Sequence, residues 1–300
     1  MREMGNAVEV SRLTKMYGSV KALDDVSFNI EADKIYGLLG RNGAGKTTIM
    51  HIITAQLFAS EGKVKVFGEA PYENNRVLEQ ICFIKESQKY PDTFRIVDVL
   101  AMAETFFPNW DREYAGALLE DFRLPLKRRM KQLSRGMLSS VGIIVGLASR
   151  APLTIFDEPY LGLDAVARSL FYDRMIEDYA EHPRTVVLST HLIDEVSRIL
   201  EHIIVIDNGR IMIDEEAEAL RGRAYSIAGT AASVETFAAG RTALDQSTFG
   251  PLVTATFMGV LDGTVRQQAE KLGLNLVPVT LQQLVVQLTK SNSGRKETNA

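Results

Sequence analysis

The chain has 300 residues, of which 46% are hydrophobic and 24% are charged, and its formal net charge is -4. These values are typical of a globular protein with a buried core, and they argue against bulk binding of nucleic acid, which needs a basic surface. The first ten residues lack the apolar centre of a secretory signal, and the longest apolar region, residues 141–156, is interrupted by Arg150 and Pro152. We therefore expect a cytoplasmic protein whose chain does not cross a bilayer.

Up to residues 220–224, short apolar runs typical of strands alternate with longer patterns of helical periodicity. This alternation predicts a mostly parallel sheet covered by helices on both faces. The strand-like runs lie at residues 34–40, 64–68, 152–158, 185–191 and 203–207, and the helical patterns lie at residues 46–58, 169–180 and 192–201. The single cysteine, Cys82, lies in the apolar run 81–86, where we expect it to belong to the core.

After residues 220–224, the pattern of predicted elements changes to a β-α-β-β-α-β order. This order predicts a small ferredoxin-like unit followed by one extra helix. Its strands are predicted at residues 225–230, 242–249, 251–260 and 274–279, and its helices at residues 234–240, 264–272 and 281–289. We therefore divide the chain into a first domain of residues 1–222 with a helical insert at about 90–150, a small α+β domain at 223–290, and a disordered tail at 291–300.

Residues 40–48 read GRNGAGKTT and match the phosphate-loop pattern G-x-x-x-x-G-K-[ST], between a predicted strand and a predicted helix. Glycines let the backbone approach phosphate oxygens with its N–H groups, and the helix N-terminus adds a positive dipole. Lys46 supplies a point charge to the β and γ phosphates, the Thr47 hydroxyl can ligate magnesium, and Thr48 can donate to phosphate. The remaining contacts are expected from the loop residues Asn42, Gly43, Ala44 and Gly45.

A second motif is the pair Asp157 and Glu158, which stands at the end of the apolar run 152–158. Consecutive side chains leave a strand on opposite faces, so the two carboxylates are expected to have different tasks. Ligands of open α/β sheets bind at the carboxyl ends of the strands, which places both residues beside the glycine loop. We expect Asp157 to hold magnesium and Glu158 to orient or deprotonate the water that attacks the γ-phosphate.

With LSRGM at residues 133–137, the chain resembles ABC-type ATPases, the nucleotide-binding subunits of ATP-binding-cassette transporters, over residues 6–221. LSRGM is similar to the family's LSGGQ signature, and it lies between the glycine loop and the Asp-Glu pair, as in the family. The resemblance implies a P-loop NTPase fold with a RecA-like, mostly parallel core, an antiparallel β subdomain and a helical insert. It also implies ATP and Mg²⁺ as cofactors, and a dimer with itself or a paralogous ATPase in which Ser134 and Gly136 face the partner's γ-phosphate.

Other positions carry over from the resemblance. Tyr17 matches the aromatic residue that stacks on adenine, although an ordinary tyrosine at a strand edge is the alternative. His191 matches the switch histidine that contacts the γ-phosphate. The loop at residues 161–164 matches the family's D-loop except for Leu161, where a small polar residue is usual. Arg135 replaces the first glycine of the signature, which is tolerable if its side chain points to solvent.

The family's metal-binding glutamine has two candidates in this chain, because Glu86 occupies the more direct alignment and Gln88 lies two residues further on. The sequence does not decide between them.

The resemblance implies an ATP-hydrolysing subunit that drives a separate integral membrane permease, peripheral on the cytoplasmic face of the membrane, with no nucleic acid partner. The signature spelling and the C-terminal extension resemble the export branch. Alternatives are an importer ATPase or a soluble ABC ATPase acting on ribosomes or DNA; a P-loop kinase would leave LSRGM and His191 unexplained. The C-terminal domain carries no catalytic pattern, and assisting dimerisation, docking to the permease or binding a regulatory ligand stay open for it.

Overall fold

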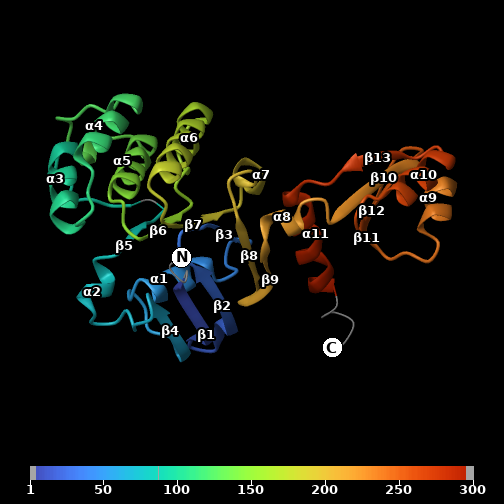
Figure 1. Ribbon diagram of the computed structural model, residues 1–300, viewed down its shortest axis with the longest axis horizontal. Coiled ribbons are helices and arrows are strands. Elements are labelled where there is room, and N and C mark those ends of the chain that lie inside the picture. Colours follow the sequence, from blue (N-terminus) through green and yellow to red (C-terminus); the bar gives the residue numbers. More distant parts are fainter. Residues whose placement is uncertain (1–4, 87, 295–300) are drawn as a thin grey trace. The chain divides into compact units, whose positions relative to one another are not determined.

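The computed structural model describes residues 5–86 and 88–294. The chain divides into two compact units, which Figure 1 shows with their helices and strands labelled. Unit 1 comprises Met1–His191 and Ile199–Asp214, and unit 2 comprises Leu192–Arg198 and Glu215–Ala300. The two units are described separately below.

The larger sheet of unit 1 has the strand order β5-β6-β7-β3-β8-β9. The pairs β5–β6, β6–β7, β7–β3 and β3–β8 are all parallel, and most of these strands are buried along their whole length. The mostly parallel core that the sequence predicted is therefore confirmed. The strands are β3 (Ile35–Leu39), β5 (Ile81–Ile84), β6 (Leu153–Asp157), β7 (Thr185–Thr190), β8 (His202–Asp207) and β9 (Arg210–Glu216).

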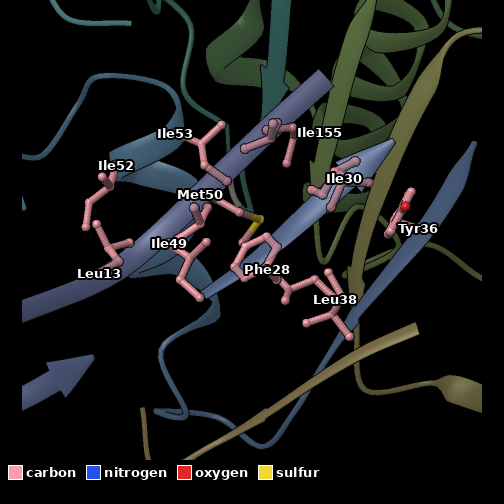
Figure 2. Packing of buried hydrophobic residues seen from close by; sticks show 14 of the residues in the cluster. Leu13, Phe28, Ile30, Tyr36, Leu38, Ile49, Met50, Ile52, Ile53 and Ile155 are labelled. Atoms are coloured by element: carbon pink, nitrogen blue, oxygen red, sulfur yellow. The ribbon is translucent and has the colours of Figure 1, made fainter. Parts of the chain in front are cut away.

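A smaller sheet in the same unit has the order β2-β1-β4, formed by β1 (Asn6–Tyr17), β2 (Val20–Glu31) and β4 (Glu61–Val66), all antiparallel. The apolar side chains of helix α1 (Lys46–Ile53) lie in the main core together with side chains from both sheets, as Figure 2 shows. Ile49 and Met50 are fully buried there against Phe28 of β2 and Ile155 of β6. This packing holds the start of α1 in place relative to both sheets.

The remaining helices of unit 1 include a group that lies together in Figure 1, formed by α3, α4 and α5. Helix α5 packs against β5 and β6, and its N-cap is Ser134, whose hydroxyl accepts a hydrogen bond of 3.2 Å from the N–H of Met137. These helices are α2 (Asn75–Leu78), α3 (Ile96–Phe106), α4 (Arg112–Asp121), α5 (Arg135–Ala148) and α6 (Ala165–Glu181), with a short 3₁₀ helix at Met130–Gln132.

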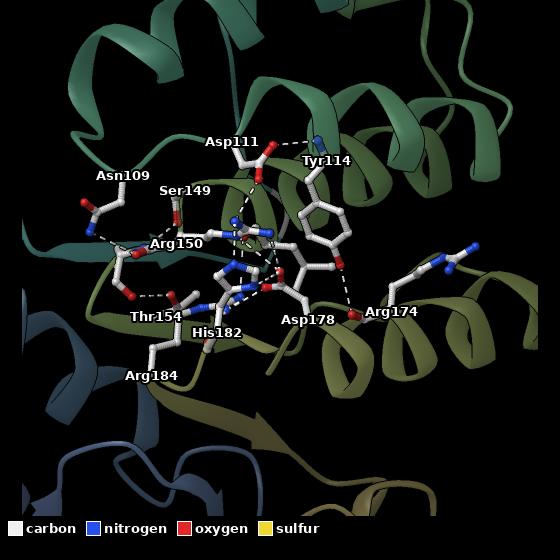
Figure 3. Close-up of polar contacts among 12 residues, drawn as sticks. Asn109, Asp111, Tyr114, Ser149, Arg150, Thr154, Arg174, Asp178, His182 and Arg184 are labelled. Carbon is white, nitrogen blue, oxygen red and sulfur yellow. Dashed lines mark hydrogen bonds and ion pairs between the residues drawn. The ribbon is translucent and has the colours of Figure 1, made fainter. Parts of the chain in front are cut away.

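An ionic network with a buried centre joins α4, α5 and α6 to the start of β7 (Figure 3). Asp178 of α6 accepts hydrogen bonds from Arg150, at 2.9 Å from Nη2, and from Arg184, at 2.6 Å from Nη1. Arg150, which follows α5, also pairs with Asp111, the N-cap of α4, at 2.8 Å. The side chains of Asp178 and Arg184 are only 2% and 4% exposed, so water does not solvate their charges. Each charge is therefore stabilised by the other, and the loss of one would leave its partner buried and unpaired.

Unit 2 contains a four-stranded antiparallel sheet with the order β11-β12-β10-β13. In chain order this is the strand arrangement of a ferredoxin-like unit, which confirms the prediction for this part of the sequence. The two helices of the motif pack their apolar side chains on the sheet, for example Phe237 on Phe257 and Tyr225. The elements are α7 (Ile193–Val196), α8 (Ala217–Leu220), β10 (Ala224–Thr230), α9 (Ala231–Ala238), β11 (Ala243–Phe249), β12 (Leu252–Met258), α10 (Gly263–Lys271), β13 (Asn275–Pro278) and α11 (Leu281–Gly294).

Helix α11 is the extra helix, and it runs to Gly294; the rest of the tail predicted at 291–300 lies outside the described residues. Over the described part of the chain, none of the helices is both long and apolar enough to span a membrane.

Candidate functional site

The candidate site lies at the carboxyl edge of the parallel sheet, where β3, β6 and β7 end next to one another. The register pairs Leu39 of β3 with Thr190 of β7, and Asp157 of β6 with Ser189 of β7. The glycine loop follows β3, so the parallel pairing brings it beside the ends of β6 and β7. This is the edge at which open α/β sheets bind ligands.

The glycine loop follows a path that a side chain at two of its positions would block. Gly40 has φ 155°, and a Cβ atom there would lie 2.3 Å from the carbonyl oxygen of Ile206 in β8. Gly45 has φ 116° and forms the N-cap of α1; its Cβ would lie 2.7 Å from a methyl group of Leu23. The loop therefore packs closely on the protein and leads directly into the N-terminus of α1, where free N–H groups and the helix dipole favour an anion.

Lys46 is 6% exposed, and its ammonium group donates a hydrogen bond of 2.7 Å to the carbonyl oxygen of Gly40. The same Nζ lies 3.8 Å from Oε1 of Glu158. Burial lowers the pKa of Lys46, whereas the carboxylates of Glu158 and Asp157 act in the opposite direction. Lys46 is thus a buried cation held between the loop backbone and the Asp-Glu pair.

Asp157 is held by two hydroxyl groups from other elements. The Thr47 hydroxyl donates to Oδ2 at 3.0 Å, and the Ser189 hydroxyl donates to Oδ1 at 2.8 Å. Asp157 is only 4% exposed. A carboxylate and a threonine hydroxyl that meet at a phosphate loop are the oxygen ligands that Mg²⁺ prefers, so these residues fit a magnesium ion.

Glu158 has a left-handed backbone conformation, with φ 49°, and is 7% exposed. Its Oε2 atom accepts a hydrogen bond from the hydroxyl of Tyr160 and lies 2.9 Å from Nδ1 of His191. Its Oε1 atom is buried and has no hydrogen-bond partner among the residues that the structure describes. The structure therefore brings Glu158 and His191 together, and it adds Tyr160, which sequence reasoning missed. The signal was an aromatic residue directly after Asp-Glu-Pro.

A cavity of about 290 Å³ is bounded by the glycine loop, Lys46, Thr47, Thr48 and the Asp-Glu pair. Glu86 also lines this cavity, and its carboxylate pairs with Arg135 at 3.2 Å. Gln88 instead lines a different pocket, and its side chain accepts a weak hydrogen bond of 3.4 Å from the N–H of Lys85. Of the two candidates for the metal-binding position, Glu86 is the one beside the loop.

His191 also borders the glycine loop. It lines a second hollow of about 470 Å³ together with Asn42 and Ala44 of the loop and with Asp207 and Asn208. The side chain of His191 is 47% exposed, so it can reach both this hollow and Glu158. Tyr17 lies at the end of β1, is half-exposed, and has the ammonium group of Lys15 over its ring at 5.2 Å from the centroid.

Ser134 and Gly136, at the start of α5, line a pocket of their own together with Gly162 and Asp164. Helix α5, which begins within the signature, contacts the loop after Glu158, because the Ser139 hydroxyl donates to the carbonyl oxygen of Leu161 at 2.7 Å. The side chain of Arg135 is 60% exposed, as its replacement of a glycine requires. Within one chain, the signature residues and the glycine loop thus border separate pockets.

The site combines a glycine loop on a helix N-terminus with a buried lysine and two carboxylates at a sheet edge. This combination is typical of α/β proteins that bind nucleotide phosphates. Residues 23–161 match the protein family described as ABC transporter. The chain belongs to this family as an ATP-binding protein of ABC transporters. This confirms the resemblance that residues 40–48, 133–137 and 157–158 indicated.

The ABC transporter ATP-binding protein YtrB of Bacillus subtilis (strain 168) is 28% identical over 65% of this chain and 67% of its own length. The Nod factor export ATP-binding protein I of Rhizobium leguminosarum bv. viciae is 31% identical over 71% of this chain and 70% of its own length. A solved structure of an ATP-binding subunit of an ABC transporter is 27% identical, with a TM-score of 0.66 over 71% of this chain and 91% of that one.

Proposed function

We propose that the chain is an ATP hydrolase that dimerises around two Mg-ATP and drives a separate membrane permease in the direction of export. The observation that carries the proposal is the convergence of Lys46, Thr47, Asp157 and Glu158 on one cavity beside the glycine loop. The family, and the name of the Nod factor export relative, support a transport role and its direction. The subunit would then be peripheral on the cytoplasmic face of the membrane.

ATP is held by its phosphates in this proposal. The loop from Asn42 to Gly45 can offer backbone N–H groups other than that of Ala44, which donates to the carbonyl oxygen of Arg41 at 3.1 Å. The adjoining α1 adds Thr48 and the positive end of its dipole. Lys46 is already desolvated, so its charge acts on the β and γ phosphates with little screening. Tyr17, whose ring is half-exposed, would stack on adenine once the Lys15 ammonium group gives way or if adenine takes the other face of the ring.

Magnesium would be held by Thr47 and Asp157, with Glu86 at the third protein position rather than Gln88. When bound, the ion neutralises charge on the β and γ phosphates. Ser189 keeps Asp157 oriented by its hydrogen bond to Oδ1. A carboxylate at position 86 adds a negative charge that an amide would not, and the ion pair with Arg135 balances it in part.

Hydrolysis is assigned to Glu158, which lines the cavity and whose Oε1 has no hydrogen-bond partner among the described residues, so this oxygen can accept a proton from the attacking water. His191, at the end of β7, would sense the γ-phosphate from the same cluster. Ser134 and Gly136 border a different pocket from the glycine loop of their own chain, which supports a role for them at the γ-phosphate held by a second subunit, either the same chain or a paralogue.

The test compares the wild-type protein with Glu158→Gln by solution mass, with and without ATP and magnesium, and by phosphate release. We expect a dimer that forms with Mg-ATP and persists in the variant, while turnover falls by about a hundredfold or more. Glu104→Gln, which changes an exposed glutamate in a surface ion pair, is the matched control and should behave as wild type. Wild-type turnover in Glu158→Gln would refute the assigned base, and a monomer under all conditions would refute the two-chain site.

Coupling to a permease is tested separately. We expect a polytopic membrane protein to co-purify with the chain from detergent-solubilised membranes. After the two are reconstituted in vesicles, the membrane protein should raise the chain's rate of phosphate release. Recovery of the chain with ribosomes or DNA, and no stimulation by membrane proteins, would favour the soluble alternative.

A further inference from the structure

Tyr160 lies at the centre of a buried cluster between the Asp-Glu pair and the end of β7. Its side chain follows Glu158 by two positions and is 3% exposed. The phenol oxygen is within hydrogen-bond distance of Oε2 of Glu158, 3.0 Å from Oγ1 of Thr190 and 3.0 Å from Nδ1 of His191. The backbone N–H of His191 donates to the same oxygen at 3.2 Å.

The hydrogen-bonding capacity of a phenol assigns a direction to each of these contacts. A phenol has one proton to donate and can accept two hydrogen bonds. Its two acceptor positions take the Thr190 hydroxyl and the backbone N–H of His191, so its proton goes to the carboxylate of Glu158. Burial raises the pKa of Tyr160, and the hydrogen bond to Glu158 acts in the same direction, so the proton is retained.

The histidine tautomer follows from this assignment. Nδ1 of His191 lies 2.9 Å from Oε2 of Glu158 and next to a phenol oxygen whose acceptor positions are already occupied. Nδ1 must therefore carry a hydrogen and donate it to the carboxylate, which assigns Nε2 as the nitrogen that remains for other contacts. Tyr160 thus helps to orient the imidazole as well as the carboxylate.

The two oxygens of Glu158 consequently have different surroundings. Oε2 accepts from the phenol and from the imidazole, whereas Oε1 is buried without a hydrogen bond in the described part of the chain and lies 3.8 Å from Nζ of Lys46. A free carboxylate side chain has several rotamers, and two fixed contacts to one oxygen select a single one. In that rotamer the lone pairs that accept no hydrogen bond from the described residues are those of Oε1, the oxygen next to Lys46, and Lys46 and Glu158 both line the cavity.

We propose that Tyr160 is a positioning residue for hydrolysis: its hydroxyl holds Oε2 of Glu158 so that Oε1 faces the attacking water. The proposal rests on the function proposed above for Glu158. The local backbone makes the arrangement possible, because the left-handed conformation of Glu158 followed by Pro159 turns the chain back, and the side chain of residue 160 returns beside that of residue 158.

The test is Tyr160→Phe, which keeps the ring and removes only the hydroxyl. We expect kcat to fall by about tenfold, the effect of losing one hydrogen bond to a charged group, while the KM for ATP and the Kd for a non-hydrolysable analogue stay within about twofold. Tyr36→Phe is the matched control, since it removes a phenol hydroxyl that is equally buried, 1% exposed, and bonded to the N–H of Glu31 at 3.0 Å. It should leave kcat unchanged.

A second comparison separates positioning from a general loss of structure. In the Glu158→Gln background, adding Tyr160→Phe should lower turnover no further, because the group that it positions is no longer a base. Unchanged or raised kcat in Tyr160→Phe, or an equal loss in both backgrounds, overturns the inference while leaving Glu158 as the base. Wild-type turnover in Glu158→Gln alone overturns the proposed function itself.

If Tyr160→Phe does not fold, 3-fluorotyrosine placed at position 160 keeps the shape of the side chain and makes its hydroxyl a stronger donor. We then expect kcat to change by about twofold or more relative to the same label at position 36. Equal rates for the two labelled proteins overturn the inference.

Discussion

The hydroxyl of Thr47 donates a hydrogen bond of 3.0 Å to Oδ2 of Asp157, although the two residues are 110 positions apart in the chain. The first follows the glycine loop and the second ends β6, so the contact joins the two halves of the candidate site. Ser189 completes the arrangement from β7, which lies between β6, the strand that ends at Asp157, and β3, the strand that precedes the glycine loop and Thr47.

Ser189→Ala removes the donor to Oδ1 of Asp157 at a position that is fully buried. Groups that orient a metal ligand influence affinity nearly as much as the ligand does. We expect the Mg²⁺ concentration for half-maximal phosphate release to rise by about tenfold. Ser149→Ala, which removes an equally buried hydroxyl bonded to Gly146, is the control and should leave it unchanged. If Ser189→Ala leaves the Mg²⁺ concentration for half-maximal phosphate release unaltered, the result would count against Asp157 as a ligand of the metal.

Two helical glycines should respond in opposite ways to alanine. At Gly146 of α5 a Cβ would lie 2.4 Å from a ring carbon of Phe156, so Gly146→Ala should lower the free energy of unfolding by about 1–3 kcal/mol. At Gly116 of α4 a Cβ meets no atom of the described residues within 4 Å, so Gly116→Ala should raise it by about 0.5–1 kcal/mol. Urea denaturation measures both; equal shifts would contradict the close packing of α5 on β6.

Much of the candidate site could be predicted because each of its motifs is local in the sequence and because the geometry of a parallel sheet brings these motifs together. Residues 40–48 contain the loop, its lysine and its helix start, and parallel strands bring their carboxyl ends to one edge whatever lies between them. The placement of Asp157 and Glu158 beside that loop therefore followed from the apolar run before them. The ferredoxin-like unit was predictable for a similar reason, since its element order alone restricts the topology.

The parts that were missed depend on tertiary contacts. The helical pattern at 192–201 forms a helix only over Ile193–Val196. The helix ends there because the following residues contact β3: Leu200 packs over Gly37, and the N–H of Glu201 donates to the carbonyl oxygen of Ile35, directly before β8 begins. The choice between Glu86 and Gln88 depends on the turn after β5, and the role of Tyr160 depends on the left-handed conformation of Glu158. Neither conformation has a periodic pattern in the sequence.

Cys82 should be chemically inert in the folded protein. It is 1% exposed in β5, and burial raises the pKa of its thiol to about 12, so the reactive thiolate is scarce at neutral pH. We expect Ellman's reagent at pH 8 to modify it only after addition of a denaturant. Rapid modification of the native protein would mean that the edge of the sheet at β5 opens readily.

Among the charged residues outside the candidate site, we expect substitution of Asp178 to cause the largest loss of stability against unfolding. Asp178→Asn removes the anion that Arg150 and Arg184 share, and it leaves the guanidinium of Arg184, 4% exposed, buried without its counter-charge. Breaking a buried pair from one side costs about 3–5 kcal/mol, so the variant should unfold at markedly lower urea concentration. Glu104→Gln breaks the exposed ion pair with Arg112 and should cost less than about 1 kcal/mol. Equal effects of the two substitutions would show that the network around Asp178 contributes no more to stability than a surface ion pair.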